Sequence, residues 1–146
     1  WSSDVCSSDL NAPLPFCAAL TAVLKAESSA FATLKGAYIS ENTDGTKNYA
    51  SKVSFAGWPS NRYGTTDAGG ASIDIKSELT TKEKATQLFT DTEKQIADCT
   101  GINGEILVAE GIDKLIIFTK NKCDVALILV TKEEESYVMI SISRAS

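Results

Sequence analysis

Residues 71–120 decide the fold, and they read ASIDIKSELT TKEKATQLFT DTEKQIADCT GINGEILVAE GIDKLIIFTK. Over residues 71–79 apolar and polar side chains alternate, which is typical of a strand with one buried face and one solvated face. Thr80 followed by Glu83 matches a capping box, in which two side chains bond the free N–H groups at a helix start. Gly101 is placed to end that helix in a left-handed conformation.

Between these two signals the side chains predict an amphipathic helix. Its apolar face is formed by Ala85, Leu88, Phe89, Thr92, Ile96 and Cys99. The apolar run at residues 115–118 is too short for a helix, so it predicts a buried strand. Residues 106–108 are ambiguous, because they fit either a short strand or a packed helical turn.

The same periodicities predict the remaining elements. We expect a first helix at 15–28 and strands at 31–40, 49–55, 114–120, 123–131 and 138–143. The order α-β-β-β-α-β-β-β, with short turns between consecutive strands, predicts one α+β domain with a mainly antiparallel sheet. The two helices should cover one face of the sheet or wrap its ends. This order is similar to that of small chaperone-like α+β folds, including type III secretion chaperones, and the likeness is one of element order.

The first ten residues, WSSDVCSSDL, match the translation of a sequencing-adapter oligonucleotide residue for residue. We therefore expect residues 1–10 to be an artefact and residues 11–146 to be the domain. Without Asp4 and Asp9 the acidic count falls from 19 to 17 against 14 basic residues, so the net charge changes from −5 to −3.

Composition excludes several classes of protein. The mild negative charge argues against a nucleic-acid partner, which calls for clustered lysine and arginine. No apolar run approaches the roughly 20 residues that a transmembrane helix needs. The sequence has no histidine, which excludes a Ser-His-Asp or Cys-His catalytic centre and the usual histidine-containing zinc sites. We expect no cofactor and no metal.

Without Cys6, which belongs to residues 1–10, three cysteines remain. They are Cys17, Cys99 and Cys123, and they lack the spacing of a metal site. They fit either three buried thiols or one disulfide with one free thiol. The flank at residues 11–15, NAPLP, resembles the residues that follow a signal-peptide cleavage site, so we expect export to the periplasm or the medium. In that case the disulfide should include Cys99, with Cys17 preferred over Cys123 as its partner.

A loop expected at residues 56–70 carries the candidate binding residues Trp58, Arg62 and Tyr63. Aromatic and arginine side chains on a loop are typical of binding sites. The alternative is that Trp58 and Tyr63 pack back onto the core. A catalytic alternative would pair Tyr63 with Asp67 in the same loop.

The other charged side chains fit solvent-facing positions rather than catalytic or metal-binding sites. Asp74, Lys76 and Glu78 share the polar face of one predicted strand, where the two carboxylates would stand roughly 13 Å apart. That separation is too large for a direct acid–base pair. The run Glu133-Glu134-Glu135 lacks the spaced oxygen ligands of a calcium loop and fits a solvated turn.

Together these observations predict a small, exported, non-catalytic binding or chaperone-like domain. Its partner would be a protein, a peptide or a small apolar ligand. A homodimer formed through the apolar faces of the last two strands is a further possibility. The rival prediction is a small enzyme that uses a carboxylate and a tyrosine near residues 56–70.

A chain that begins at Asn11 should unfold at the same temperature as the full chain, because residues 1–10 are expected to contribute no packing. Thermal melts followed by circular dichroism test this. A loss of more than about 1 kcal/mol would be large against ordinary protein stability and would show that residues 1–10 belong to the fold.

Overall fold

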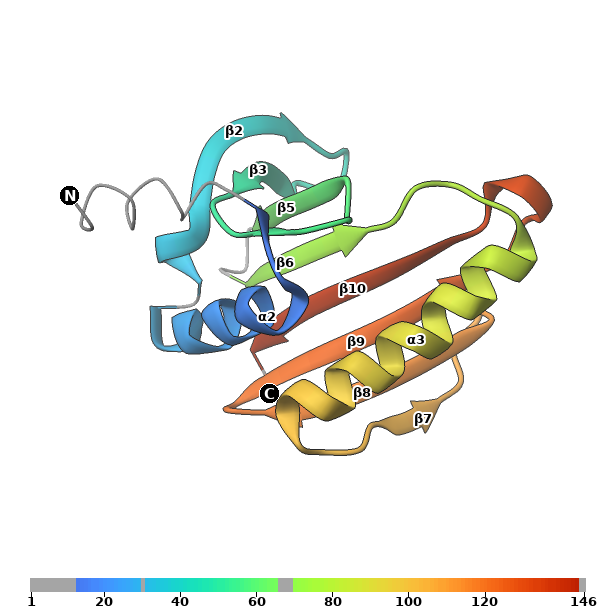
Figure 1. The fold of residues 1–146 in the computed structure, drawn as a ribbon. Coiled ribbons are helices and arrows are strands. Elements are labelled where there is room, and N and C mark those ends of the chain that lie inside the picture. Colours follow the sequence, from blue (N-terminus) through green and yellow to red (C-terminus); the bar gives the residue numbers. More distant parts are fainter. Residues whose placement is uncertain (1–12, 30, 66–69, 145–146) are drawn as a thin grey trace.

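The computed structural model describes residues 13–29, 31–65 and 70–144, and confirms the predicted α+β class (Figure 1). An eight-stranded antiparallel sheet forms the body of the domain. In spatial order its strands are β2 (Lys35–Glu41), β3 (Lys47–Ser51), β5 (Ser60–Thr65), β6 (Ala71–Lys76), β10 (Tyr137–Arg144), β9 (Cys123–Val130), β8 (Lys114–Lys120) and β7 (Glu105–Leu107).

The sheet consists of two four-stranded meanders that meet at its centre. The first meander places β2 at one edge and β6 at the centre, and the second places β7 at the other edge and β10 at the centre. An α-helix precedes each meander, so the two halves of the chain share the order of one helix and four sheet strands. The β6–β10 ladder joins the halves, with Ile73 opposite Ile142 and Ile75 opposite Ile140.

The two α-helices are α2 (Phe16–Lys25) and α3 (Lys82–Thr100), and both lie on the same side of the sheet (Figure 1). The side chains that α3 buries repeat at helical spacing and are Ala85, Phe89, Thr92, Ile96 and Thr100. Beneath the helices the strands contribute alternate residues to one continuous core, including Ile73, Ile75, Phe118, Val125, Leu127, Val138, Ile140 and Ile142. This alternation leaves the other set of strand side chains on the opposite face.

The start of α3 corrects the predicted cap by one residue. Thr81 is the N-cap, and its Oγ1 accepts a hydrogen bond of 3.3 Å from the backbone N–H of Lys84. The backbone of Thr80 instead exchanges two hydrogen bonds with Ser136, which ties the segment between β6 and α3 to the residue before β10. Gly101 ends the helix with φ of 74°, in the left-handed conformation that was predicted.

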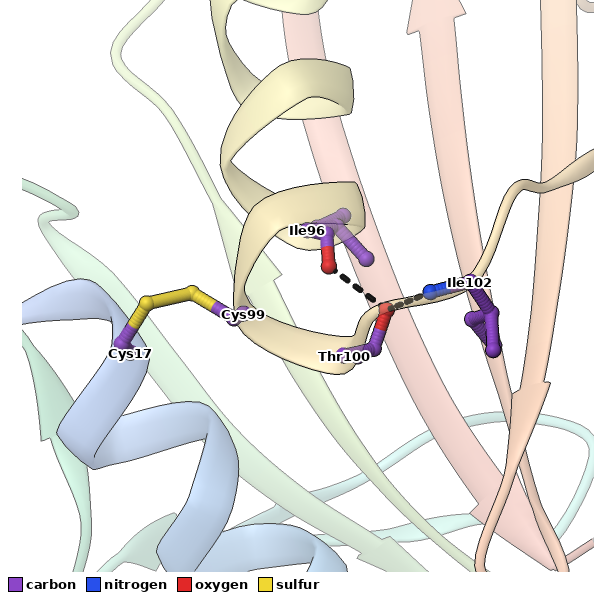
Figure 2. The surroundings of a disulfide bond; sticks show 5 residues. All are labelled: Cys17, Ile96, Cys99, Thr100 and Ile102. Carbon is purple, nitrogen blue, oxygen red and sulfur yellow. Dashed lines mark hydrogen bonds between the residues drawn. A yellow bond between two sulfur atoms is a disulfide. The ribbon is translucent and has the colours of Figure 1, made fainter.

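A disulfide between Cys17 and Cys99 joins α2 to the last turn of α3 (Figure 2). The two Cα atoms lie 5.5 Å apart, and the bridge closes a sequence separation of 82 residues. It is the pair that the sequence analysis preferred. Cys123 is a buried free thiol at the start of β9. A crosslink over so long a loop restricts the unfolded chain and stabilises the packing of the two helices.

Short elements complete the described chain. A parallel pair, β1 (Pro13–Leu14) with β4 (Ser54–Phe55), holds the chain that leads into α2. Three 3₁₀ turns lie at Ala26–Ser29, Ala32–Leu34 and Glu133–Glu135. Among the described residues, no helix has the length and apolar character needed to span a bilayer.

Replacing Thr81 with Ala should lower the free energy of unfolding by about 0.5–2 kcal/mol, because the capping hydrogen bond is lost. Thr80→Ala is the matched control and should cost less, since Thr80 acts through its backbone. Urea melts of both variants decide between the two threonines. If Thr80→Ala proved the more costly change, the helix would begin one residue earlier than Lys82.

Candidate functional site

The sheet face opposite the helices carries the candidate site. Strand side chains on that face are half-buried or exposed, whereas their neighbours in sequence are buried beneath α2 and α3. None of the described α-helices lies over it (Figure 1). We call this surface the open face. One-sided sheets of this kind are common in antiparallel folds, and their free face is normally polar.

A pocket of about 470 Å³ is hollowed into the open face over β5 and β6, and it reaches β10. Its lining comes from β3, β5, β6, the residues after β6, and β10, and consists of Asn48, Ser60, Arg62, Asp74, Lys76, Ser77, Leu79 and Met139. The strand register explains why these residues meet. Arg62 lies directly opposite Asp74, and Lys76 lies opposite both Ser60 on β5 and Met139 on β10.

Asp74 stands at the junction of the two halves of the sheet. Ser141, its partner across the β6–β10 ladder, donates a hydrogen bond of 2.7 Å from Oγ to Asp74 Oδ1, and Ser72 Oγ donates one of 3.2 Å to Oδ2. Burial raises the pKa of Asp74 above its ordinary value of 3.8, and the bonds from Ser141 and Ser72 offset part of that rise. Both carboxylate oxygens are therefore engaged within the sheet.

Two cations border this carboxylate. Arg62 is exposed, and its guanidinium makes no hydrogen bond or ion pair with any side chain within the described ranges. Lys76 Nζ lies 4.2 Å from the centroid of the Tyr137 ring, which holds the ammonium at the pocket wall. With two basic groups and one acidic group among its lining residues, the pocket is positive in a chain whose net charge is −5.

An apolar band adjoins the pocket on the same face. It consists of Leu115, Ile117, Ala126, Ile128 and Met139, which are all half-buried. The register places Leu115, Ile128 and Met139 side by side in one row that continues into Lys76. The open face therefore changes from apolar over β8–β10 to cationic over β5–β6.

The prediction of a loop at residues 56–70 is wrong over Ser60–Thr65, because these residues form β5 between β3 and β6. Trp58 is 9 % exposed and Tyr63 is 4 % exposed, and both side chains belong to the hydrophobic core, which was the alternative interpretation of the sequence. Burial raises the pKa of Tyr63, and the ring packs edge-on against Tyr49. Of the three expected binding residues, Arg62 is the one that lines the pocket.

The pocket also contains residues that the sequence analysis assigned to solvation. Asp74 and Lys76 were interpreted as the wet face of a strand, and they do lie on that face. The signal that could have singled them out is the serine pattern of the last strand, because Ser141 comes to face Asp74. That pairing joins residues 67 positions apart in the chain, so local periodicity does not reveal it.

Other groups offer little chemistry. Burial, with smaller effects of Glu27 and Asp124, raises the pKa of the Cys123 thiol to about 11, so it stays protonated near neutral pH. Within residues 13–29, 31–65 and 70–144, no three acidic or cysteine side chains cluster closely enough to hold a metal ion. Asp67, the proposed partner of Tyr63 in the catalytic alternative, lies outside the described residues.

Comparison with known proteins adds no family. The chain matches no protein-family model, no curated protein and no solved structure. The fold and the site therefore define its class by themselves: an α+β domain whose eight-stranded antiparallel sheet is covered by helices on one face and carries a cationic pocket on the other.

Replacing Asp74 with Asn should stabilise the protein more at neutral pH than in acid. The folded-state pKa of Asp74 lies above the unfolded value of 3.8, so the folded protein binds this proton more tightly. Its favourable contribution is present below pH 3.8 and is lost as the pH rises through the folded-state pKa. Urea melts at about pH 3 and about pH 7 measure the free energy of unfolding of both proteins. The value for the variant minus the value for the wild type should rise with pH.

The control for this titration is Asp91→Asn, at an exposed position of α3. It preserves the change in formal charge while leaving the sheet untouched. A difference for Asp74→Asn that is constant or falls with pH would contradict the assigned environment of Asp74.

Proposed function

We propose that this protein is an extracytoplasmic, non-catalytic binding protein whose open face takes an amphiphilic anion. The single observation that carries the proposal is the row in which the apolar band continues directly into Lys76, with Arg62 beside it. A ligand with an apolar chain and one anionic end fits both parts at once. An apolar surface next to a small number of placed polar groups is typical of ligand sites.

The anionic end would lie between Arg62 and Lys76. Arg62 is free to turn towards a ligand, since no side-chain partner holds it among the described residues. A guanidinium presents a planar set of donors that matches a carboxylate with two parallel hydrogen bonds. The charge of Asp74 opposes an anion, but its two oxygens already accept hydrogen bonds from Ser141 and Ser72.

Binding is favoured over catalysis by the inventory of the pocket. Its lining holds a single carboxylate, so it lacks the paired acid and base that carboxylate enzymes use. The sequence contains no histidine that could replace one of them. The remaining polar groups are serine hydroxyls, an asparagine amide and two cations, which bind and orient ligands.

The Cys17–Cys99 disulfide supports an extracytoplasmic location. Disulfides persist in the periplasm and in secreted proteins, whereas cytosolic thiols are kept reduced. Peptide mapping of the protein from its native host, without reduction, would test this part of the proposal separately. Free Cys17 and Cys99 in that preparation would contradict export.

Octanoate is a suitable probe for the ligand site, with octanol as its uncharged counterpart. In NMR titrations of the full chain, octanoate should shift the amide signals of β5, β6 and β10 and bind more tightly than octanol. Arg62→Gln should lower the affinity for octanoate by about tenfold. That loss corresponds to the weaker hydrogen bonds to a charged group, as expected at an exposed position. Octanol should bind this variant as it binds the wild type.

Lys47→Gln is the matched control, because it removes one exposed cation from β3 at a position that does not line the pocket. Octanoate affinity unchanged by Arg62→Gln, or lowered equally by Lys47→Gln, would contradict the assigned site. A concentration-dependent dimer that buries β8–β10 and excludes octanoate would show that a second copy occupies the open face instead.

A further inference from the structure

We propose that the free edge of β7 binds an extended, basic peptide segment of a partner protein as an added strand. The first observation is topological. β7 pairs with β8 on one side, and no described strand pairs with its other side. Half of the backbone N–H and C=O groups of such an edge strand point outward and can pair with another chain. This site is separate from the pocket of the open face and depends on different residues.

The two edges of the sheet differ in how they are protected. At the β2 edge the pairing with β3 is interrupted by two register shifts, and Lys35 lies on the strand itself. Bulges and lysines are the usual devices that keep an edge from pairing further. β7 is three residues long and begins with Glu105, but it keeps an unbroken register with β8 over residues 105–107 and contains neither lysine nor proline. The structure therefore leaves one edge open to strand addition.

An apolar groove runs beside this open edge, between β7 and α3. It has a volume of about 280 Å³ and is lined by Phe89, Glu93, Ile106, Leu107, Val108, Asp113, Lys114 and Ile116. Ile106 is 77 % exposed and Val108 is 99 % exposed, although both are β-branched apolar residues. A strand edge next to a helix-lined groove is the arrangement that proteins use to bind extended peptides, with the backbone on the edge and alternate side chains in the groove.

The edge is held in place before any peptide binds. Gly104 packs so closely on β8 that an added Cβ would clash with Ile116 Cγ2 and press against the ring of Phe118. Larger residues at this position would lift the start of β7 away from the sheet. Binding to a strand that is already ordered costs less conformational entropy than ordering a loop.

The acidic side chains around the groove favour a basic peptide. Glu93 and Asp113 lie in the groove, and Glu105 and Glu110 flank it along the chain. Two lysines lie near these acidic groups: Lys114, whose Nζ is 5.9 Å from the centroid of the Phe89 ring, and Lys82, which interacts electrostatically with Asp113. The excess of acidic groups complements a peptide that alternates apolar residues with lysine or arginine. It also disfavours a second copy of this chain, because two β7 edges would each bring the same excess of acidic groups to the contact.

Selection from a phage-displayed library of random nonapeptides on the full chain tests this inference. We expect the enriched peptides to alternate apolar with basic residues. The most enriched peptide, labelled with fluorescein, should lose at least tenfold in affinity on Ile106→Lys, measured by fluorescence anisotropy. Ile39→Lys is the matched control, because Ile39 is 46 % exposed on the opposite edge strand β2, and it should change the affinity less than twofold.

Three further readouts keep the test decisive. Glu93→Gln should lower the affinity for the peptide severalfold. Raised salt should lower the affinity further. NMR should show that amides within residues 105–109 become protected from hydrogen exchange when the peptide binds. Failure to enrich any peptide, or enrichment that survives Ile106→Lys, would overturn the proposal. A loss on Ile39→Lys instead would move the site to the β2 edge. Dimerisation abolished by Ile106→Lys would replace the peptide with a second copy.

Discussion

The ladder between β6 and β10 is the interaction on which the rest of this structure depends. It pairs the last strand of each meander, so two separate four-stranded sheets become one sheet of eight strands. On the helix side it brings together Ile73, Ile75, Ile140 and Ile142, which are all fully buried. On the other side it brings Ser141 within hydrogen-bond distance of Asp74, and it places Met139 beside Lys76 in the pocket lining. Stability and the candidate site therefore arise from the same strand pairing.

The helices explain why the two faces differ. The Cys17–Cys99 bridge and the packing of α3 on β8–β10 keep both helices on one side of the sheet. The opposite face must then meet solvent or a partner with whatever side chains alternate outward. In the first meander these include Arg62, Asp74 and Lys76, and in the second they form the apolar band. Two halves with the same order of elements thus present different chemistry on one surface.

Local patterns predicted the elements whose residues follow one periodicity. The apolar face of α3, its end at Gly101 and the alternation of the last strand all appear in the structure. The prediction failed at β5, because residues 60–65, SNRYGT, do not alternate and include asparagine and glycine, which are uncommon in strands. This segment forms a strand since β3 and β6 pair with it from both sides. The cap moved to Thr81 for a similar reason, as Ser136 holds the backbone of Thr80.

The sequence by itself determined the fold class, the helix positions and most strands, because these depend on side chains within a few turns or residues of one another. It also singled out Cys17 with Cys99 as the preferred disulfide and Arg62 as a binding candidate. Only the tertiary structure decided that Trp58 and Tyr63 are buried, that Asp74 faces Ser141, and that one sheet edge is blunted while the other is open. Those features depend on strand order and register, and contacts between residues far apart in the chain leave no periodic trace in the sequence.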